Sequence, residues 1–352
     1  MQVETLLPLG KIDPGLRAAD TPLDIARIGE DARLVEELGY DGLVSEETKD
    51  DPYIVMGLAA QATRGLKLAT GVAMAFPRSP TITAMSAWSL QRLSKGRFTL
   101  GLGSQVKGHI QRRFGMAWSA PAPWMREYVV ALRAIWNTWQ TGAPLDIRGE
   151  HYNINLTVPL FTPAPLEHPH IPIHLAAVNR YMCQVAGEVA DGIRPHPVCT
   201  PKYIADVMLP AVRTGAVKGA RPLDGFAVCV KPLVATAADH SKLQDAIRNV
   251  RARVAFYAST PAYAAAFEAH GLGELAKELS AYSRAQRWDE MPTFITDDIL
   301  HTYAVVGTWD EIAEKLRERY GKIATHLEFS IAVASAADKA RLRQMVQHLQ
   351  RG

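Results

Sequence analysis

The sequence predicts an α/β protein, a single (β/α)8 TIM barrel that spans residues 1–352 and carries insertions. Four strand-and-helix units follow one another within about the first 100 residues, and the whole chain offers eight strand-like segments without a linker-like break in composition. Such barrels take roughly 250 residues, so about 100 of the 352 residues are surplus. We assign this surplus to insertions at about 105–120, 141–169 and 239–322.

Apolar runs and helix-start signals define the elements of the first half. Thr21-Pro22 and Ser79-Pro80 each place an N-cap residue before a proline at the first helical position. Apolar residues recur at helical spacing from 25 to 38, and Gly39 predicts the end of that helix. Strands are predicted at 3–9, 41–45, 66–75 and 97–102, and helices at 25–38, 52–63 and from 80 onwards.

The second half is less regular. Residues 105–120 are expected to form a basic loop that contains glycine, and a polar, proline-rich excursion covers 141–169. Thr200-Pro201 repeats the helix opening, and between about 239 and 322 we find only helical signals, including a capping box at 308–311. Strands are predicted at 171–176, 192–193, 226–235 and 326–333, and helices at 125–139, 181–190 and 336–349.

The composition is that of an ordinary globular protein. Hydrophobic residues make up 48% of the chain and charged residues 21%, which is typical of neither a disordered chain nor a coiled coil. A formal net charge of +3 lacks the basic excess of a dedicated nucleic-acid binder. Cys183, Cys199 and Cys229 form no C-x-x-C pair and are expected to stay reduced. We find no secretory signal and no apolar run near the roughly 18 residues of a membrane span, so we expect a cytoplasmic protein with no membrane partner.

Several motifs that would indicate another chemistry are incomplete. Segment 101–106 begins like the dinucleotide fingerprint G-x-G-x-x-G, but Val106 stands at the third glycine. Segment 103–109 has the glycine spacing of a P-loop, but His109 stands at the phosphate-binding lysine. The histidines between 168 and 174 are interleaved with Pro169 and Pro172 and have no neighbouring thiol, so we favour a proline-stiffened loop over a metal site.

Four segments, in the expected order over most of residues 1–235, carry a resemblance to a known family. They are GYDGLVSEET at 39–48, LATGV at 68–72 with RSP at 78–80, GRFTLGLGS at 96–104, and IPIHLAA at 171–177 with AGEVADG at 186–192. On these segments the sequence resembles the luciferase-like monooxygenase superfamily, and within it the oxidoreductases that use the deazaflavin coenzyme F-420. The resemblance implies a flavin or deazaflavin ring across the C-terminal mouth of a barrel, and a homodimer.

The resemblance also implies roles for individual residues. An acid at the end of the second strand would lie near the ring edge, which points to Glu47, within one residue of Glu46. A non-proline cis peptide is implied at Gly71-Val72. Thr200 and Lys202, at a helix N-terminus, would bind the coenzyme phosphate, although Thr200 also suits a plain N-cap. The other implied coenzyme contacts are Ser104, and Ala176, Ala177 and Val178 behind the ring.

The sequence departs from the sugar-phosphate dehydrogenases of this family. Thr48 stands where those enzymes have a histidine, and Gln105 or Val106 stands where they have a glutamate, so the proton-transfer pair for a sugar hydroxyl is missing. We expect His109 to move the proton instead, because its ordinary pKa of about 6.5 suits neutral pH. A solvated surface loop is the alternative for its basic segment. The predicted catalytic residues are His109, Glu47 and Gln105, and the predicted substrate contacts are Thr48, Arg112 and Arg113.

These observations predict an F-420-dependent oxidoreductase, which transfers a hydride between an 8-hydroxy-5-deazaflavin and a small organic substrate. One alternative is an FMN-dependent luciferase-like monooxygenase that activates dioxygen. The second alternative is a non-catalytic deazaflavin carrier, which would suit the missing glutamate. We expect neither a metal nor a nucleic-acid partner.

Overall fold

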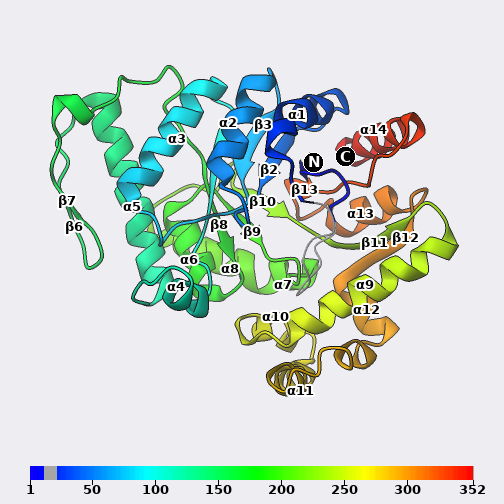
Figure 1. The fold of residues 1–352 in the computed structure, drawn as a ribbon. Helices are drawn as coiled ribbons and strands as arrows, with labels where there is room; N and C mark the ends of the chain where they lie inside the picture. Colours follow the sequence, from blue (N-terminus) through cyan, green and yellow to red (C-terminus); the bar gives the residue numbers. More distant parts are fainter. Residues whose placement is uncertain (12–21, 352) are drawn as a thin grey trace.

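The computed structural model describes residues 1–11 and 22–351, and their strands form a closed parallel barrel (Figure 1). The barrel strands are β1 (Gln2–Leu6), β2 (Gly42–Ser45), β3 (Lys67–Thr70), β5 (Phe98–Gly103), β8 (Ile173–Ala177), β9 (Gly192–Pro195), β10 (Ala227–Val230) and β13 (His326–Glu328). Their order is β3, β2, β1, β13, β10, β9, β8 and β5, and β5 pairs back with β3. The predicted (β/α)8 barrel is confirmed.

Helices cover the outside of the barrel, and two of the predicted helix openings are confirmed. Ser79 Oγ accepts a hydrogen bond from the Ile82 N–H at 3.3 Å, and Thr200 Oγ1 accepts one from the Tyr203 N–H at 3.2 Å. Each proline that follows is the first residue of its helix. The outer helices are α1 (Ile28–Glu37), α2 (Pro52–Ala62), α3 (Pro80–Ser94), α5 (Pro121–Thr141), α6 (Arg180–Val189), α7 (Pro201–Tyr203) continued by a π-helical turn (Ile204–Met208) into α8 (Leu209–Lys218), α13 (Ile312–Tyr320) and α14 (Ala336–Gln350).

The first outer helix begins later than the sequence predicts. Thr21, its predicted N-cap, lies outside the described residues, and Pro22 is not helical. Asp24 Oδ1 instead accepts a hydrogen bond from the Ala26 N–H at 3.0 Å and opens a 3-10 turn (Ile25–Arg27) that leads into α1. An aspartate is a strong cap because its carboxylate both accepts the free N–H and suits the positive end of the helix.

Two predicted strands divide into two pieces each. Segment 66–75 forms β3 and then β4 (Ala73–Met74), which continues to pair with β5. Segment 226–235 forms β10 and then β11 (Leu233–Ala237), which leaves the barrel and pairs with β12 (Ala304–Thr308). Strand β12 lies in the region where we predict only helices, so that prediction is wrong. Its partner β11 is remote in the sequence, which explains why local patterns did not reveal it.

The predicted capping box at 308–311 forms only in part. Glu311 Oε2 accepts hydrogen bonds from the Thr308 N–H at 2.8 Å and from Thr308 Oγ1 at 3.0 Å. Helix α13 begins only at Ile312, because Thr308 is still the last residue of β12. The carboxylate therefore ties the strand end to the helix start, and the reciprocal cap by Thr308 is absent.

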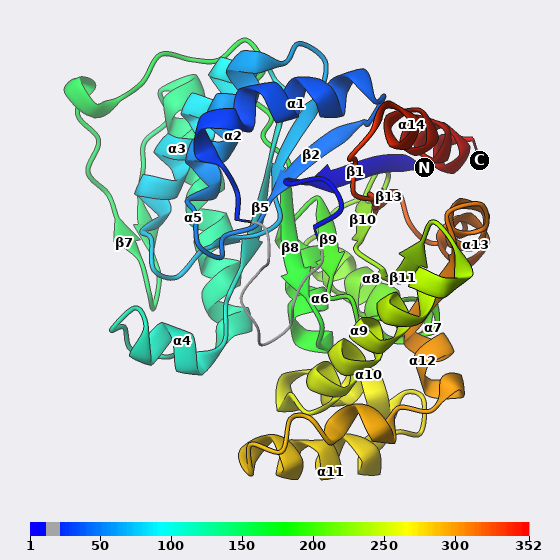
Figure 2. The ribbon, with the colours of Figure 1, turned by 45° about the vertical axis from the view of Figure 1, so that its right-hand side comes forward.

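The three expected insertions have structure of their own. Segment 105–120, expected to be a loop, contains the helix α4 (Lys107–Arg112). Segment 141–169 contains an antiparallel hairpin of β6 (Ile147–Arg148) and β7 (Asn153–Ile154) that projects from the barrel (Figure 1). The third insertion supplies α9 (His240–Ala258), η4 (Pro261–Tyr263), α10 (Ala264–Glu268), α11 (Gly273–Arg284), η5 (Met291–Phe294) and α12 (Asp297–Tyr303). Figure 2 shows α4 and α9 to α11 on the same side of the barrel.

Charged side chains cross the barrel interior, where apolar layers usually fill such barrels. Arg194 on β9 bonds to Glu4 on β1, although β10 and β13 separate these two strands round the barrel, so the ion pair must span the interior. A small apolar group of Leu6, Val44 and Ala69 packs separately from the main core. Among the described residues, no helix combines the length and the apolar character that a membrane crossing needs.

Candidate active site

A large cavity opens at the carboxyl ends of the barrel strands, which is where barrel enzymes build their sites. Its volume is about 1510 Å³, beyond the roughly 300–1,000 Å³ of an ordinary small-molecule pocket. The strand ends form its floor, and α4, the start of α5, α6, α9 and η4 contribute to its walls. The cavity therefore has room for more than one bound molecule.

One half of the floor, which we call the glycine-alanine half, consists of small residues from β3, β5, β8 and the turns that follow them. A Cβ atom added at Gly103 would lie 2.6 Å from Val72 Cγ2 and 3.6 Å from Ala176 Cβ, so only glycine leaves this surface undisturbed. The Gly71-Val72 peptide is cis, as the resemblance implies. A surface without long side chains fits one face of a planar ring. The glycine-alanine half comprises Gly71, Val72, Gly103, Ser104, Ala176 and Ala177.

The other half, which we call the charged half, consists of Glu46, Arg194, Lys231 and Glu328 from the ends of β2, β9, β10 and β13. Lys231 forms ion pairs with both carboxylates, to Glu46 and, at 3.3 Å from Nζ to Oε1, to Glu328. Lys11 Nζ also donates to Glu46 Oε2 at 2.8 Å. Glu46 therefore forms ion pairs with two lysines, whereas Glu328 forms one with Lys231, which it shares with Glu46.

This unequal pairing shifts the pKa values of the two carboxyl groups in opposite directions. Burial alone would raise the pKa of Glu46, but the ammonium groups of Lys231 and Lys11 outweigh burial and lower it to about 2. Burial raises the pKa of Glu328 above its usual 4.5, against the opposing effect of Lys231. Glu46 is thus the carboxyl that keeps its negative charge to lower pH, and Glu328 is the carboxyl that holds a proton more readily.

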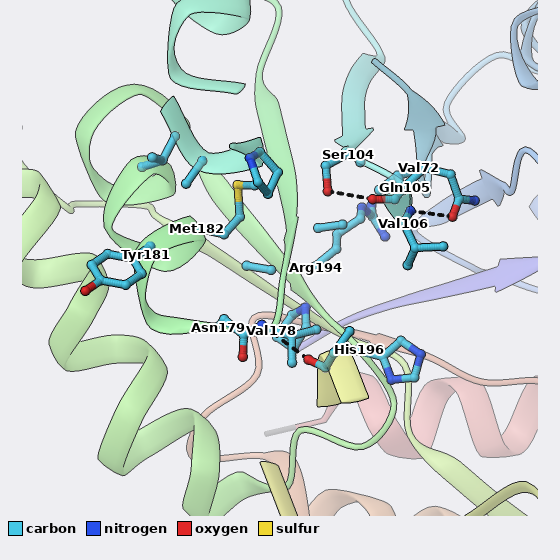
Figure 3. Close-up of a pocket in the computed structure, with 18 of the residues that line it drawn as sticks. Val72, Ser104, Gln105, Val106, Val178, Asn179, Tyr181, Met182, Arg194 and His196 are labelled. Atoms are coloured by element: carbon cyan, nitrogen blue, oxygen red, sulfur yellow. Dashed lines mark hydrogen bonds between the residues drawn. The ribbon is translucent and has the colours of Figure 1, made fainter. Parts of the chain in front are cut away.

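Below these groups, Arg194 and Glu4 form the buried ion pair that crosses the barrel. Arg194 Nη1 donates to Glu4 Oε2 at 3.0 Å and Nη2 to Oε1 at 3.3 Å, and the two side chains are only 10% and 8% exposed. Arg194 Nε is buried and has no hydrogen-bond partner among the described residues. Figure 3 shows Arg194 between Val72 and Gln105 on one side and Tyr181 and Met182 on the other.

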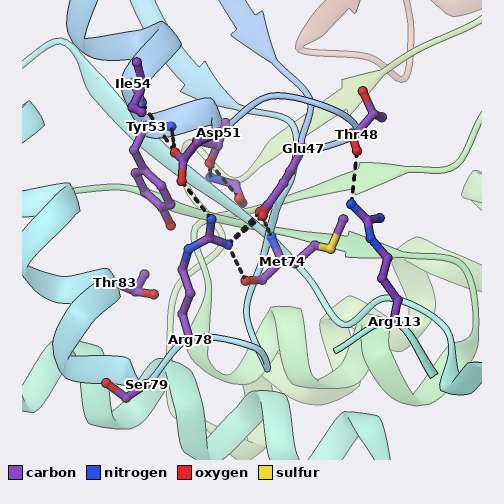
Figure 4. A network of polar contacts seen from close by, with 12 residues as sticks. Glu47, Thr48, Asp51, Tyr53, Ile54, Met74, Arg78, Ser79, Thr83 and Arg113 are labelled. Carbon is purple, nitrogen blue, oxygen red and sulfur yellow. Dashed lines mark hydrogen bonds and ion pairs between the residues drawn. The ribbon is translucent and has the colours of Figure 1, made fainter. Parts of the chain in front are cut away.

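Glu47 connects the end of β2 to the segment after the cis peptide (Figure 4). Its Oε2 accepts hydrogen bonds from the Met74 N–H at 2.7 Å and from Arg78 Nη1 at 2.8 Å. Arg78 Nη2 also donates to Asp51 Oδ2 at 3.1 Å, and Asp51 caps α2. Glu47 lines the cavity, but its charge is already paired, so its evident effect is to hold the glycine-alanine half in place.

The structure brings nine of the predicted site residues to the cavity. They are Glu47, Thr48, Gly71, Val72, Ser104, Gln105, Ala176, Ala177 and Val178. Gln105 adopts a left-handed backbone with φ of 56°, and its Oε1 accepts a hydrogen bond from the Val106 N–H at 2.9 Å. The predicted residues that gather here are those at strand ends, whose positions follow from the strand pattern.

Five predicted site residues lie outside the cavity lining. His109 and Arg112 are exposed on α4, and Arg113, at its end, donates from Nη2 to the Thr48 carbonyl at 3.2 Å. Thr200 is buried, and its Oγ1 hydrogen-bonds to His270 Nε2 at 2.8 Å besides capping α7. Lys202 is exposed and forms an ion pair with Asp206. The expected loop contains the helix α4, and its three basic side chains, at 109, 112 and 113, are not among the lining residues.

Sequence reasoning missed most of the charged half and an aromatic wall beside it. Lys231 and Glu328 lie inside predicted strands, and Arg194 directly follows one. Charged residues in or beside apolar strand segments could therefore have indicated these site residues. His196, after β9, stacks on Tyr263 at 4.0 Å between ring centroids and meets Tyr257 edge-on at 4.7 Å. In residues 1–11 and 22–351, no group of three or more potential ligands could hold a metal ion.

The fold and the site define a barrel protein with a large cavity at its mouth, one half of which is uncharged and the other charged. The sequence matches the family described as luciferase-like monooxygenase over residues 6–326, and the chain belongs to this family. Membership makes the protein an oxidoreductase.

Individual relatives share much of the chain. It is 43% identical over 298 residues to an uncharacterized protein of Mycobacterium tuberculosis, covering 85% of this chain and 88% of that protein. It is 26% identical over 294 residues to the 5,10-methylenetetrahydromethanopterin reductase of Archaeoglobus fulgidus, covering 81% and 83%. The solved coenzyme F420-dependent tetrahydromethanopterin reductase of Methanopyrus kandleri superposes with a TM-score of 0.73 at 19% identity, covering 99% of this chain and 97% of that one, which shows a shared fold.

Proposed function

We propose that this oxidoreductase transfers a hydride between coenzyme F-420 and a small organic substrate that bind together in the cavity. The observation that carries the proposal is the glycine-alanine half, where a surface of small residues adjoins enough volume for a second molecule. The Archaeoglobus and Methanopyrus reductases support it, the second by its stated dependence on F420. When bound, the deazaflavin would supply or accept the hydride.

This chain's own residues would hold the ring and the substrate face to face. Val72, pressed between Gly103 and the cavity, and Ala176 would contact the ring, while Glu47 keeps the segment after the cis peptide in position through Met74. The substrate would occupy the remaining space, next to the charged half. A coenzyme phosphate that reached Lys202 would compete with Asp206 for its ammonium group.

Binding measured separately with F-420 and with FMN tests the proposal. We expect oxidised F-420 to bind the purified protein, with its fluorescence quenched and the Tm of the protein raised, because a ligand that binds only the folded state stabilises it. Tight FMN binding without F-420 binding would favour the monooxygenase alternative. F-420 binding without turnover of any acceptor would favour the carrier.

We also propose that the protein is a homodimer. Apolar side chains are exposed on the outer faces of the neighbouring helices α2 and α3, where Ile54 is 58% exposed and Ile82 and Met85 are each 53% exposed. A run of exposed apolar side chains is typical of a surface that another chain covers. Sedimentation velocity of the purified protein would distinguish one copy from two.

A further inference from the structure

The charged half contains two carboxyl groups in different states. Glu46, directly after β2, is held by the ammonium groups of both Lys11 and Lys231, and Lys231 follows β10, which β1 and β13 separate from β2. Among the described residues, Glu328 forms one ion pair, with Lys231 at 3.3 Å, and its side chain accepts no hydrogen bond. The Glu328 side chain is 12% exposed and lines the cavity. It is therefore the carboxyl that a bound substrate can reach and that no partner saturates.

Four charged groups influence Glu328. Glu46 from β2 and Glu4 from β1, which is its Cα partner in the barrel, are like charges that disfavour a second anion. Arg194 from β9 is already engaged with Glu4, and Lys231 after β10 is drawn towards Glu46. This arrangement makes the neutral form of Glu328 easier to reach than that of Glu46, and it keeps one ammonium close by.

We infer that Glu328 gives a proton to the substrate heteroatom when the substrate carbon receives the hydride, and takes it back in the reverse direction. The inference deepens the proposed function and rests on it. It assigns the substrate to compounds with a polarised C=O or C=N bond, whose reduction places the hydride on carbon and the proton on oxygen or nitrogen. The O–H bond of Glu328 breaks, an O–H or N–H bond forms on the substrate, and solvent in the cavity returns the proton to Glu328.

Lys231 would be the positioning residue for this step. Loss of the proton leaves a carboxylate at Glu328, and the Lys231 ammonium 3.3 Å away stabilises the charge that forms. Glu46 prevents Lys231 from moving wholly to Glu328 beforehand, because it holds the same ammonium. Two other candidates are less suited. His109 is exposed outside the cavity lining, and His196 already accepts a hydrogen bond at Nδ1 from the Val198 N–H at 3.4 Å.

Infrared spectroscopy of the protein without coenzyme is the first test. We expect the band of a neutral carboxylic acid to persist above pH 4.5 in the parent and to be absent from Glu328→Gln. Glu46→Gln should shift the disappearance of this band to lower pH, because it removes a like charge and frees Lys231 for Glu328. Glu278→Gln, at an exposed glutamate outside the cavity lining, is the matched control and should leave the band unchanged. A band that survives in Glu328→Gln, or that does not move in Glu46→Gln, would overturn the inference.

The second test mixes reduced F-420 with a panel of aldehydes, ketones and cyclic imines in a stopped-flow instrument. Glu328→Gln should bind F-420 within about twofold of the parent and transfer hydride about 10²–10⁴ times more slowly, the usual effect of losing a general acid. An unchanged rate, or a comparable loss in His109→Gln or His196→Gln instead, would overturn the assignment to Glu328. A parent that binds F-420 but reduces no member of the panel would overturn the substrate class. If the parent does not bind F-420, the proposed function itself is refuted. The infrared test is independent of this outcome, because it is done without the coenzyme.

Discussion

The two halves of the cavity floor are both built from the carboxyl ends of barrel strands, but one carries small uncharged residues and the other carries charged ones. In the glycine-alanine half, the ends of β3, β5 and β8 carry residues without charge or bulk, such as Gly71, Gly103 and Ala176. In the charged half, Glu46 and Lys231 directly follow β2 and β10, and Arg194 and Glu328 lie in the last two residues of β9 and β13. A barrel offers eight equivalent strand ends, so shape and charge can be supplied separately. On the proposed function, the coenzyme would lie on an uncharged surface, whereas the substrate would lie beside groups whose charge can change.

The two halves should differ in how they affect the free energy of unfolding. Charges removed from water are unfavourable unless each has a partner, and the pair of Glu4 and Arg194 is almost fully buried. The glycine-alanine half buries no charge, and its constraint is space. Substitutions in the two halves should therefore fail for different reasons.

The largest effect is expected from Arg194→Met. It leaves Glu4 as an uncompensated buried anion, so the free energy of unfolding should fall by about 3–5 kcal/mol. Urea denaturation followed by circular dichroism at neutral pH measures this loss. Arg248→Met breaks an ion pair whose side chains are 70% and 67% exposed, and it should change stability by no more than about 0.5 kcal/mol.

A double variant sharpens this prediction. Glu4→Leu combined with Arg194→Met removes both charges, and it should recover part of the stability that Arg194→Met loses, because no unpaired charge remains. If Arg194→Met lowers the free energy of unfolding no more than Arg248→Met does, burial of charge does not destabilise the charged half. The contrast between the two halves would then be wrong.

The sequence predicted the two halves unequally, for a physical reason. Strand positions follow from local apolar runs, and the resemblance supplied Gly71-Val72 and Ala176, so the glycine-alanine half was largely predictable. Glu46 and Lys231 lie in distant parts of the chain and meet only because the barrel closes, and no local pattern contains that information. The expectation that His109 lies over the cavity rested on a predicted loop, whereas the helix α4 forms there and leaves His109 exposed outside the lining. Its role in proton transfer stays a prediction.

The next effect is a pH dependence that should be specific to the charged half. The pKa of Glu46 is about 2 in the folded protein against its usual 4.5, so its contribution to stability is complete above pH 4.5 and is lost as the pH falls towards 2. At about 1.4 kcal/mol per pKa unit, this contribution is about 3 kcal/mol. Over that window Glu46→Gln should therefore lose less stability than the parent does, as urea denaturation at a series of pH values would show. Glu278→Gln should follow the parent, and a Glu46→Gln curve parallel to that of the parent would contradict the pairing with Lys231 and Lys11.

The smallest effect is expected in the glycine-alanine half, from Gly103→Ala. The new Cβ would lie 2.6 Å from Val72 Cγ2, and Val72, a stiff β-branched residue, would have to move into the cavity. We expect a loss of only about 1 kcal/mol in the free energy of unfolding, at the low end for overpacking, but about tenfold weaker binding of F-420, because the flat surface is disturbed where the ring would lie. Gly57→Ala in α2 is the matched control. Its Cβ would meet only Leu90 Cδ2 at 3.8 Å, so affinity should not change, while stability should rise by up to about 1 kcal/mol because alanine favours a helix. Equal F-420 affinity in Gly103→Ala and the parent would mean that the ring does not lie on this half, and the division of the floor into a coenzyme side and a substrate side would have to be reversed.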